Sequence, residues 1–205
     1  MKKLARLFVV IAIGSACFLG CSKSEDFDYE RALEEQRIKD SLELERKKKI
    51  IAEQAGALKA FADQHMEGAT LHDSTGIWLQ ILEPGDNNSY TYQVSARGGI
   101  LAPRISVKYK GTLLDGTVFD ESKDDKPVEM SLASVIEAWQ LAFLPKTFRF
   151  NGDNHTTGGL TPNGFKKGAK FRIVTPSPWA YDTATREKIP ANSPLYFEIE
   201  VVDIK

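Results

Sequence analysis

The second half of the chain alternates apolar and polar positions in short runs separated by turn signals. The run "IWLQIL" ends at Pro84-Gly85, and "ISVKYKG" alternates from Ile105 to Tyr109. The segments "YTYQV", "KFRIVT" and "PLYFEIEVVDI" have the residue composition of β-strands, whereas "LASVIEAWQLAF" has the spacing of a short helix. Many strands with one helix predict an α+β domain over residues 68–205, in which a curved antiparallel sheet wraps around the helix.

Residues 27–66 have a different pattern, rich in Glu, Lys, Arg, Gln and Ala, without proline and with Gly56 as the only glycine. This composition predicts a long helix whose mixed charges face solvent. Apolar residues recur every seven positions at Leu44, Ile51 and Leu58. The positions three residues after them are Lys47, Gln54 and Phe61, so the helix has a poor coiled-coil pattern. Residues 21–67 are therefore expected to be a tether and helical arm. Two readings remain open, a solvated spacer and an arm that pairs two copies through residues 27–66.

One β-hairpin, "YKGTLLDGTVFDES", ends in an unusual way. The dipeptide Asp115-Gly116 predicts a two-residue turn between its strands. The second strand then finishes with Phe119 and Asp120, which places a carboxylate beside a large aromatic ring and opposite Tyr109. Taken alone, Asp120 reads as a solvated acid at a sheet edge; the alternative is a residue of a functional site.

The N-terminus has the pattern of a targeting signal over residues 1–20. A basic start precedes an apolar run, Leu7 to Leu19, that is too short to span a bilayer comfortably. Gly20 and Cys21 follow, and this junction resembles a bacterial lipoprotein signal, in which Cys21 is lipidated; an ordinary cleaved signal is the alternative. The resemblance implies a lipid-anchored protein of the bacterial cell envelope, with the outer membrane as the expected site.

Charge and residue spacing exclude several functions. The 27 Lys and Arg nearly balance the 28 Asp and Glu, which argues against nucleic acid as a partner. His65, His72 and His155 lack the spacing of metal ligands, and no glycine-rich phosphate loop is present. We therefore expect no metal and no cofactor.

Six motifs follow one another in the second half of the chain. They are Val107-Lys108-Tyr109-Lys110-Gly111 with the Asp115-Gly116 turn, Phe119-Asp120, Val135-Ile136-Glu137-Ala138-Trp139, Gly168-Ala169-Lys170, Ala180-Tyr181, and Ile189-Pro190 with Leu195, Phe197, Ile199 and Glu200. This order resembles the FKBP-type peptidyl-prolyl isomerases over residues 105–205, and more loosely over 76–84. The resemblance implies an FKBP-like fold and an apolar cleft that accelerates rotation about X-Pro bonds, without a cofactor, in proline-containing segments of exported proteins.

The resemblance also implies a set of site residues. The catalytic group comprises Tyr109, Phe119, Asp120 and Tyr181. The substrate-binding group comprises Val128, Met130, Val135, Ile136, Trp139, Ile189 and Phe197.

Three departures from the family pattern leave a second function open. Val128 and Met130 stand where aromatic residues are frequent, and Asp182 follows Tyr181 where glycine is usual. About twenty residues, near 145–164, are inserted after the predicted helix, as a substrate-gripping lobe, a lid over the cleft, or a tolerated surface hairpin or loop. The alternative function is a catalytically weak binding or chaperone module that serves an envelope secretion or motility assembly.

Overall fold

The structure, a computed structural model, describes residues 24–205 of the chain, without the side chains of residues 24–27. The predicted signal, residues 1–20, and the predicted lipidation site Cys21 lie outside the described residues. The chain forms two compact units, one that ends at Glu43 and one that spans Leu44–Lys205.

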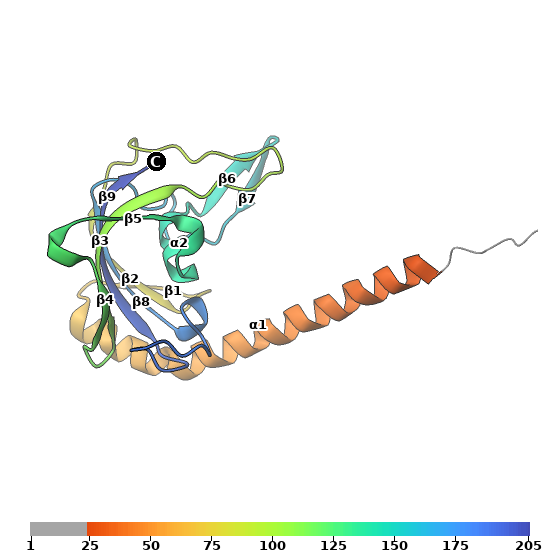
Figure 1. Cartoon of the computed structure of the whole chain (residues 1–205), viewed down its shortest axis with the longest axis horizontal. Coiled ribbons are helices and arrows are strands. Elements are labelled where there is room, and N and C mark those ends of the chain that lie inside the picture. Colours follow the sequence, from red (N-terminus) through yellow and green to blue (C-terminus); the bar gives the residue numbers. More distant parts are fainter. Residues whose placement is uncertain (1–23) are drawn as a thin grey trace, which may run out of the picture. The chain divides into compact units, whose positions relative to one another are not determined.

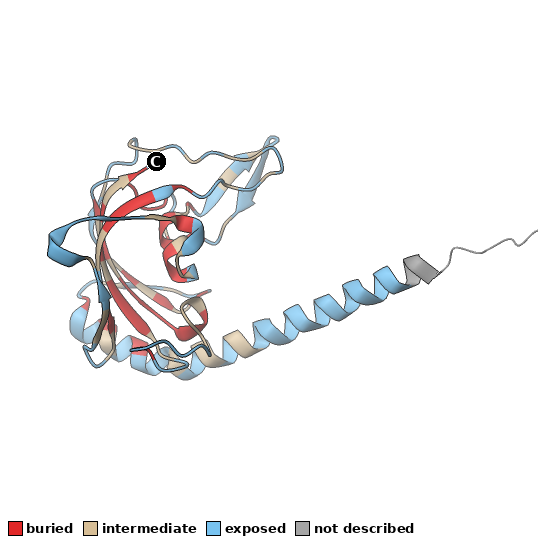
Figure 2. Ribbon diagram, in the orientation of Figure 1, coloured by how far each residue is buried: buried red, intermediate tan, exposed pale blue. Residues whose placement is uncertain are grey.

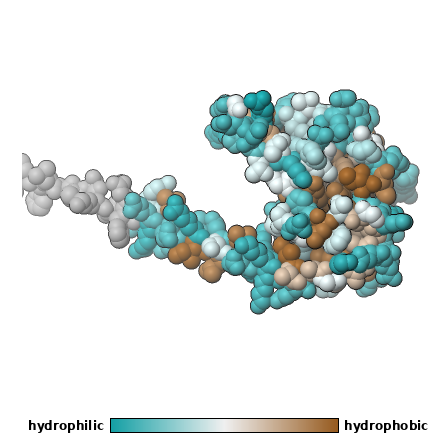
Figure 3. All heavy atoms as spheres, turned by 180° about the vertical axis from the view of Figure 1, so that it is seen from behind, coloured by the Kyte–Doolittle hydropathy of each residue, from teal (hydrophilic) through white to brown (hydrophobic). Residues whose placement is uncertain are grey.

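The predicted long helix is confirmed as α1, Ser24–His65. Up to Glu43 its described side chains are exposed, and they include apolar residues such as Leu33 and Leu42. Figure 3 shows hydrophobic residues scattered among hydrophilic ones along the helix. Pairs such as Arg31 with Glu35 support the helix at i,i+4 spacing. No helix within residues 24–205 is long and apolar enough to cross a membrane.

The domain is built on a curved antiparallel sheet of seven strands, with α2 in its hollow (Figure 1), which confirms the predicted α+β fold. The strand order is β1-β2-β8-β9-β3-β4, and β5 pairs with the other half of β3. The strands are β1 Thr70–His72, β2 Ile77–Pro84, β3 Arg104–Leu113, β4 Val118–Glu121, β5 Val128–Ser131, β8 Ala169–Thr175 and β9 Leu195–Ile204. The helical elements are α2 Glu137–Phe143 and the 3₁₀ turns η1 Lys123–Asp125, η2 Leu132–Ser134 and η3 Ser177–Trp179.

The main core lies between the sheet and α2, where Figure 2 shows the buried residues of both. Alternate residues of β8 and β9, such as Phe171 and Ile199, face this core together with Phe143 of α2. The rings of Phe165 and Phe171 stack with centroids 3.9 Å apart. The core therefore fixes α2 against the sheet and sets the position of every residue that α2 carries.

The second half of α1 covers one end of the other sheet face. Leu58 and Ala62 of α1, and Met66 directly after it, are buried against Val174 of β8 and Tyr196 of β9. The outer face of β8 accordingly changes from charged residues, Lys170 and Arg172, to an apolar one, Val174. The prediction of a separate solvated arm over residues 21–67 differs from this arrangement, because the compact domain begins at Leu44 and includes about the last six turns of the helix.

The hairpin between β3 and β4 closes with a longer loop than predicted. Leu113 accepts a hydrogen bond from the Gly116 N–H at 3.1 Å, and its own N–H donates to Thr117 at 3.0 Å. Gly116 alone has a positive φ, 88°, so the loop is a type I turn followed by a left-handed glycine. The prediction of a two-residue Asp115-Gly116 turn is wrong by one residue, since Asp115 keeps a negative φ.

The segment "YTYQV" forms no strand, contrary to prediction. Its last residue, Val94, forms an isolated antiparallel β-bridge with Ile100. Tyr92 packs against the core instead, and its hydroxyl donates a hydrogen bond to the Phe143 carbonyl at the end of α2. The apolar residues that suggested a strand are thus used to close the end of the core.

The inserted segment, residues 145–164, contains a β-hairpin of β6 Thr147–Phe150 and β7 Asp153–Thr156. Asn151 and Gly152 both have positive φ, 51° and 90°, as a type I′ turn requires. The Phe148 ring stacks on His155 at 5.4 Å. Side chains of β7 are all exposed, so the insertion is a surface hairpin.

Candidate active site

A pocket of about 210 Å³ lies between α2 and the sheet. It is smaller than the roughly 300–1,000 Å³ of pockets for drug-sized ligands, and suits one or two residues of a peptide. Its walls come from β3, β4, β5 and β9, from the segment between β5 and α2, from the loop after η3, and from α2. They are Tyr109, Phe119, Asp120, Met130, Ser134, Val135, Ile136, Trp139, Tyr181 and Phe197.

Aromatic rings meet edge to face around this pocket. Trp139, which is 3% exposed, lies 5.2 Å from the Tyr109 centroid and 5.5 Å from the Phe197 centroid, at 83° and 84°. Phe119 and Phe197 are 5.6 Å apart at 82°. Gly111 makes this packing possible, because a Cβ there would stand 2.6 Å from Phe119 Cζ. The result is an apolar box with Trp139 at its base.

Asp120 is tied to this box through Tyr109. The Tyr109 hydroxyl donates a hydrogen bond to Oδ2 of Asp120 at 2.7 Å, although the residue paired with Asp120 across the two strands is Gly111. Burial raises the pKa of Tyr109, and the bond to Asp120 raises it further. The phenol therefore stays protonated and keeps its donor role.

Several hydrogen-bond donors of the pocket have no partner within residues 24–205, among them the buried indole N–H of Trp139. The Tyr181 hydroxyl makes no hydrogen bond there, and its side chain is half-buried. Ile136 precedes the first residue of α2, and its N–H is likewise unpaired. The Tyr181 hydroxyl and the Ile136 N–H are available to carbonyl groups of a bound peptide.

The structure brings together nine of the eleven predicted site residues. Val128 stands on β5 with 37% of its surface exposed and does not line the pocket. Ile189 is buried and lines an adjoining hollow, with Arg186 and Lys188, that shares Phe119, Asp120 and Tyr181 with the pocket.

Sequence reasoning missed three kinds of residue. Ser134 lines the pocket, although its motif offers no chemical signal beyond the turn that it forms with Ser131. Arg186 lies with its guanidinium 5.3 Å from the Tyr181 ring centroid. Residues of α1 contact the loop that carries Tyr181, and the only hint of this was Asp182 in place of the usual glycine.

The other face of the sheet has a wider hollow with different chemistry. Lysines and arginines there pair with neighbouring acids: Lys170 with Glu83 at 3.0 Å and Arg172 with Glu198 at 3.1 Å. Such exposed pairs solubilise a surface and contribute little stability. Within residues 24–205, no three His, Cys, Asp or Glu side chains come together as a metal site.

The two pocket tyrosines are expected to ionise only in strongly alkaline solution. Burial is the main cause that raises the pKa of Tyr109 and of Tyr181. Because the folded protein favours the protonated phenol, this contribution to stability is present below the unfolded pKa of about 10 and is lost as the pH rises through the folded pKa. In an absorbance titration, the number of tyrosines that ionise above the usual pH range should be smaller by one in Tyr109→Phe than in the parent. Equal titrations of the two proteins would contradict the expectation.

Comparison with known proteins agrees with this geometry. Residues 102–202 match the family model of the FKBP-type peptidyl-prolyl cis-trans isomerases. The chain is 30% identical over 195 residues to the FKBP-type isomerase FkpA of Escherichia coli K12, with 92% of this chain and 60% of that protein covered. It is 38% identical over 102 residues to FkpA of Buchnera aphidicola from Schizaphis graminum, with 49% of this chain and 33% of that protein covered.

A solved structure shows the same fold. The crystal structure of FkpA from Escherichia coli aligns with a TM-score of 0.52 at 28% identity, over 90% of this chain and 75% of that one. This chain spans 60% of the length of the curated Escherichia coli relative. Residues 102–202 therefore form a domain of the FKBP-type peptidyl-prolyl cis-trans isomerase family.

Proposed function

We propose that this protein is a peptidyl-prolyl cis-trans isomerase that acts through the aromatic pocket. The observation that carries the proposal is the apolar box of Trp139, Phe197, Tyr109 and Phe119 with two unpaired donors at its edge. An apolar box of this size suits a pyrrolidine ring, and the donors suit the carbonyls on either side of it.

The reaction needs no nucleophile. Rotation about a peptide bond is opposed by a barrier of about 18–20 kcal/mol, which arises from amide resonance. The twisted imide has lost that resonance and much of its carbonyl polarity, so it favours dry, apolar surroundings more than the planar form does. A pocket that excludes water from the imide thus binds the twisted state more tightly. A million-fold acceleration requires about 8 kcal/mol of such differential binding.

Each pocket residue has a role in this mechanism. Trp139 is the base on which the proline ring rests, with Phe119 and Phe197 as walls. The hydroxyl of Tyr181 and the N–H of Ile136 bind substrate carbonyls. Asp120 orients the Tyr109 phenol through their 2.7 Å hydrogen bond and is not a base. Met130 and Val135 complete the lining of the pocket.

The expected substrates are proline-containing segments of exported proteins, and the expected location is the bacterial envelope. The support is the lipoprotein-like signal over residues 1–20 with Cys21 as the lipid attachment site. Each buried methylene of an acyl chain contributes about 0.8 kcal/mol of membrane affinity. Pairing of two copies through residues 27–66 remains a separate proposal, which rests on the length of α1.

A catalytically weak binding or chaperone module is the second candidate. The hairpin β6–β7 favours it, because this inserted element exposes most of its side chains. None of residues 145–164 lines the pocket, so the hairpin leaves the pocket open to a peptide. An open pocket favours an active isomerase over a binding module whose pocket is blocked.

The deciding experiment is cis/trans exchange of a short proline peptide, followed by NMR with the full chain present. Uncatalysed isomerisation takes about 10–100 s. We expect exchange at least about a thousandfold faster at catalytic protein concentration. A folded protein that shifts the peptide resonances without accelerating exchange would favour the binding module and rule out the enzyme.

A further inference from the structure

The loop that carries Tyr181 is held from outside the sheet. This Tyr181 loop, residues 176–192, has only turns and short bridges within it. Its internal hydrogen bonds include the Asp182 N–H to Ser177 at 2.9 Å and the Asn192 N–H to Asp182 at 2.6 Å. The bonds cross the base of the loop near Asp182, so the backbone at Asp182 controls where Tyr181 lies.

Helix α1 contacts this backbone through Arg46. The Arg46 guanidinium makes a two-pronged ion pair with the Asp182 carboxylate, in which the Nη1 to Oδ1 distance is 3.1 Å. The two side chains are 34% and 26% exposed, so the pair is partly shielded from water. The two residues lie 136 positions apart in the chain.

Gln54, two turns further along α1, contacts both ends of the same loop. Its Nε2 donates hydrogen bonds to Ser177 Oγ at 3.0 Å and to the Asn192 carbonyl at 2.9 Å. Its Oε1 accepts a hydrogen bond from the Ser177 N–H at 2.8 Å. A single side chain thus joins the start of the Tyr181 loop to its end.

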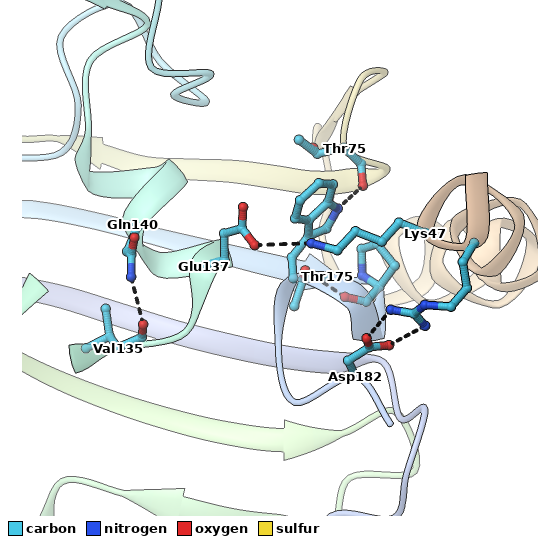
Figure 4. A network of polar contacts seen from close by, with 10 residues as sticks. Lys47, Thr75, Val135, Glu137, Gln140, Thr175 and Asp182 are labelled. Carbon is cyan, nitrogen blue, oxygen red and sulfur yellow. Dashed lines mark hydrogen bonds and ion pairs between the residues drawn. The ribbon is translucent and has the colours of Figure 1, made fainter. Parts of the chain in front are cut away.

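A third contact connects α1 to the element that carries Trp139. Lys47 places its ammonium 4.8 Å from the Trp179 ring centroid and 3.6 Å from Glu137 in the first turn of α2. The Trp179 indole N–H donates to the Thr75 carbonyl at 2.7 Å. Figure 4 shows the contact between Lys47 and Glu137.

Asp182 needs such support because its φ is 50°, in the left-handed region. Glycine adopts this conformation freely, whereas a residue with a side chain is strained there. The Arg46 ion pair compensates for that strain. The backbone next to Tyr181 therefore depends on a residue of α1, which precedes the segment matched by the family model.

We propose that Arg46 and Gln54 are positioning residues for the pocket. They hold the Tyr181 loop so that the Tyr181 hydroxyl stands where it meets a substrate carbonyl. Neither residue lines the pocket, so both act through the loop. The inference rests on the proposed isomerase function, because its catalytic consequence requires a substrate at Tyr181.

The test compares Arg46→Ala with the parent full chain, and uses Lys49→Ala as the matched control. Lys49 is a cation of the same helix with a side chain 79% exposed and no contact with the loop. We expect Arg46→Ala to raise KM about tenfold and to change kcat less than twofold. The reason is that Tyr181 binds a carbonyl equally in the planar and twisted states. Gln54→Ala should act in the same direction, and Lys49→Ala should match the parent.

A rescue separates positioning from a general loss of stability. The double variant Arg46→Ala, Asp182→Gly should return KM to within about twofold of the parent, because glycine needs no partner at a positive φ. A merely structural ion pair would leave the double variant as impaired as Arg46→Ala. A KM that rises in Arg46→Ala and stays raised in the double variant would therefore overturn the proposal.

A second readout is independent of catalysis. Amide hydrogen exchange at Asp182 and Asn192 should become about tenfold faster in Arg46→Ala and stay unchanged in Lys49→Ala. If Arg46→Ala is active and has the hydrogen exchange rates and the KM of the parent, the positioning role is overturned while the proposed isomerase function stands. A parent without isomerase activity would overturn the proposed function, and with it the catalytic role of Arg46 and Gln54.

Discussion

Replacement of Leu58 by alanine lowers the free energy of unfolding by about 2–5 kcal/mol, the usual cost for a fully buried leucine. Leu58 has no exposed surface and packs between α1 and the outer face of the sheet, against Val174 and Tyr196. The alanine leaves a cavity there, since two strands and a helix surround the site and cannot all move inward. Chemical denaturation followed by tryptophan fluorescence measures the change.

Leu42→Ala is the control for this expectation. Leu42 lies on the same helix with 66% of its surface exposed, so its loss should change the free energy by less than about 0.5 kcal/mol. Equal effects of the two variants would mean that α1 does not pack on the sheet in solution. The same packing implies that a chain shortened to begin at Gly68 would leave Val174 and Tyr196 uncovered.

Replacement of Phe119 by alanine lowers kcat/KM by about 100-fold, which corresponds to about 2.7 kcal/mol of transition-state binding. Phe119 is a wall of the pocket, where its ring meets Phe197 edge to face. Its loss admits water to the imide and removes the apolar surface that favours the twisted state. Peptide exchange by NMR gives the rate, and thermal denaturation gives the stability of the same sample.

Phe148→Ala is the matched control, because Phe148 is a partly buried ring of the inserted hairpin and does not line the pocket. It should keep the parent's kcat/KM within about twofold. A Phe119→Ala protein with undiminished activity would exclude this pocket as the reacting site. Equal losses in both variants would point to the hairpin as part of the substrate surface.

The two effects concern two sides of one sheet. Leu58 stabilises the outer face, and Phe119 acts on the inner face. The Tyr181 loop links these sides, since Gln54 and Arg46 reach it from α1 while Tyr181 lines the pocket. Binding in the pocket and packing of the helix are therefore expected to influence each other, and hydrogen exchange in the loop is the observable that reports both.

Much of the fold was predictable because its signals are local. Alternation in "ISVKYKG" and the motif around Trp139 each depend on neighbours a few positions away. Tyr109 and Asp120 come from the two strands of one hairpin, so their hydrogen bond was accessible to sequence reasoning. The segment "YTYQV" misled for the same local reason, because apolar spacing does not reveal whether a chain pairs with a strand or packs as coil.

The sequence by itself determined the strands β2, β3, β4, β8 and β9, the helix α2, the family motifs and the eight pocket residues that lie in those motifs. Only the tertiary structure decided that α1 packs on the sheet and that Arg46 meets Asp182. It also decided that Val128 lies outside the pocket. Periodicity along a helix shows which residues share a face, but the partner of that face is set by chain segments more than a hundred residues away. An ion pair such as Arg46 with Asp182 leaves no pattern in either segment, because it exists only where the folded backbone brings the two side chains together.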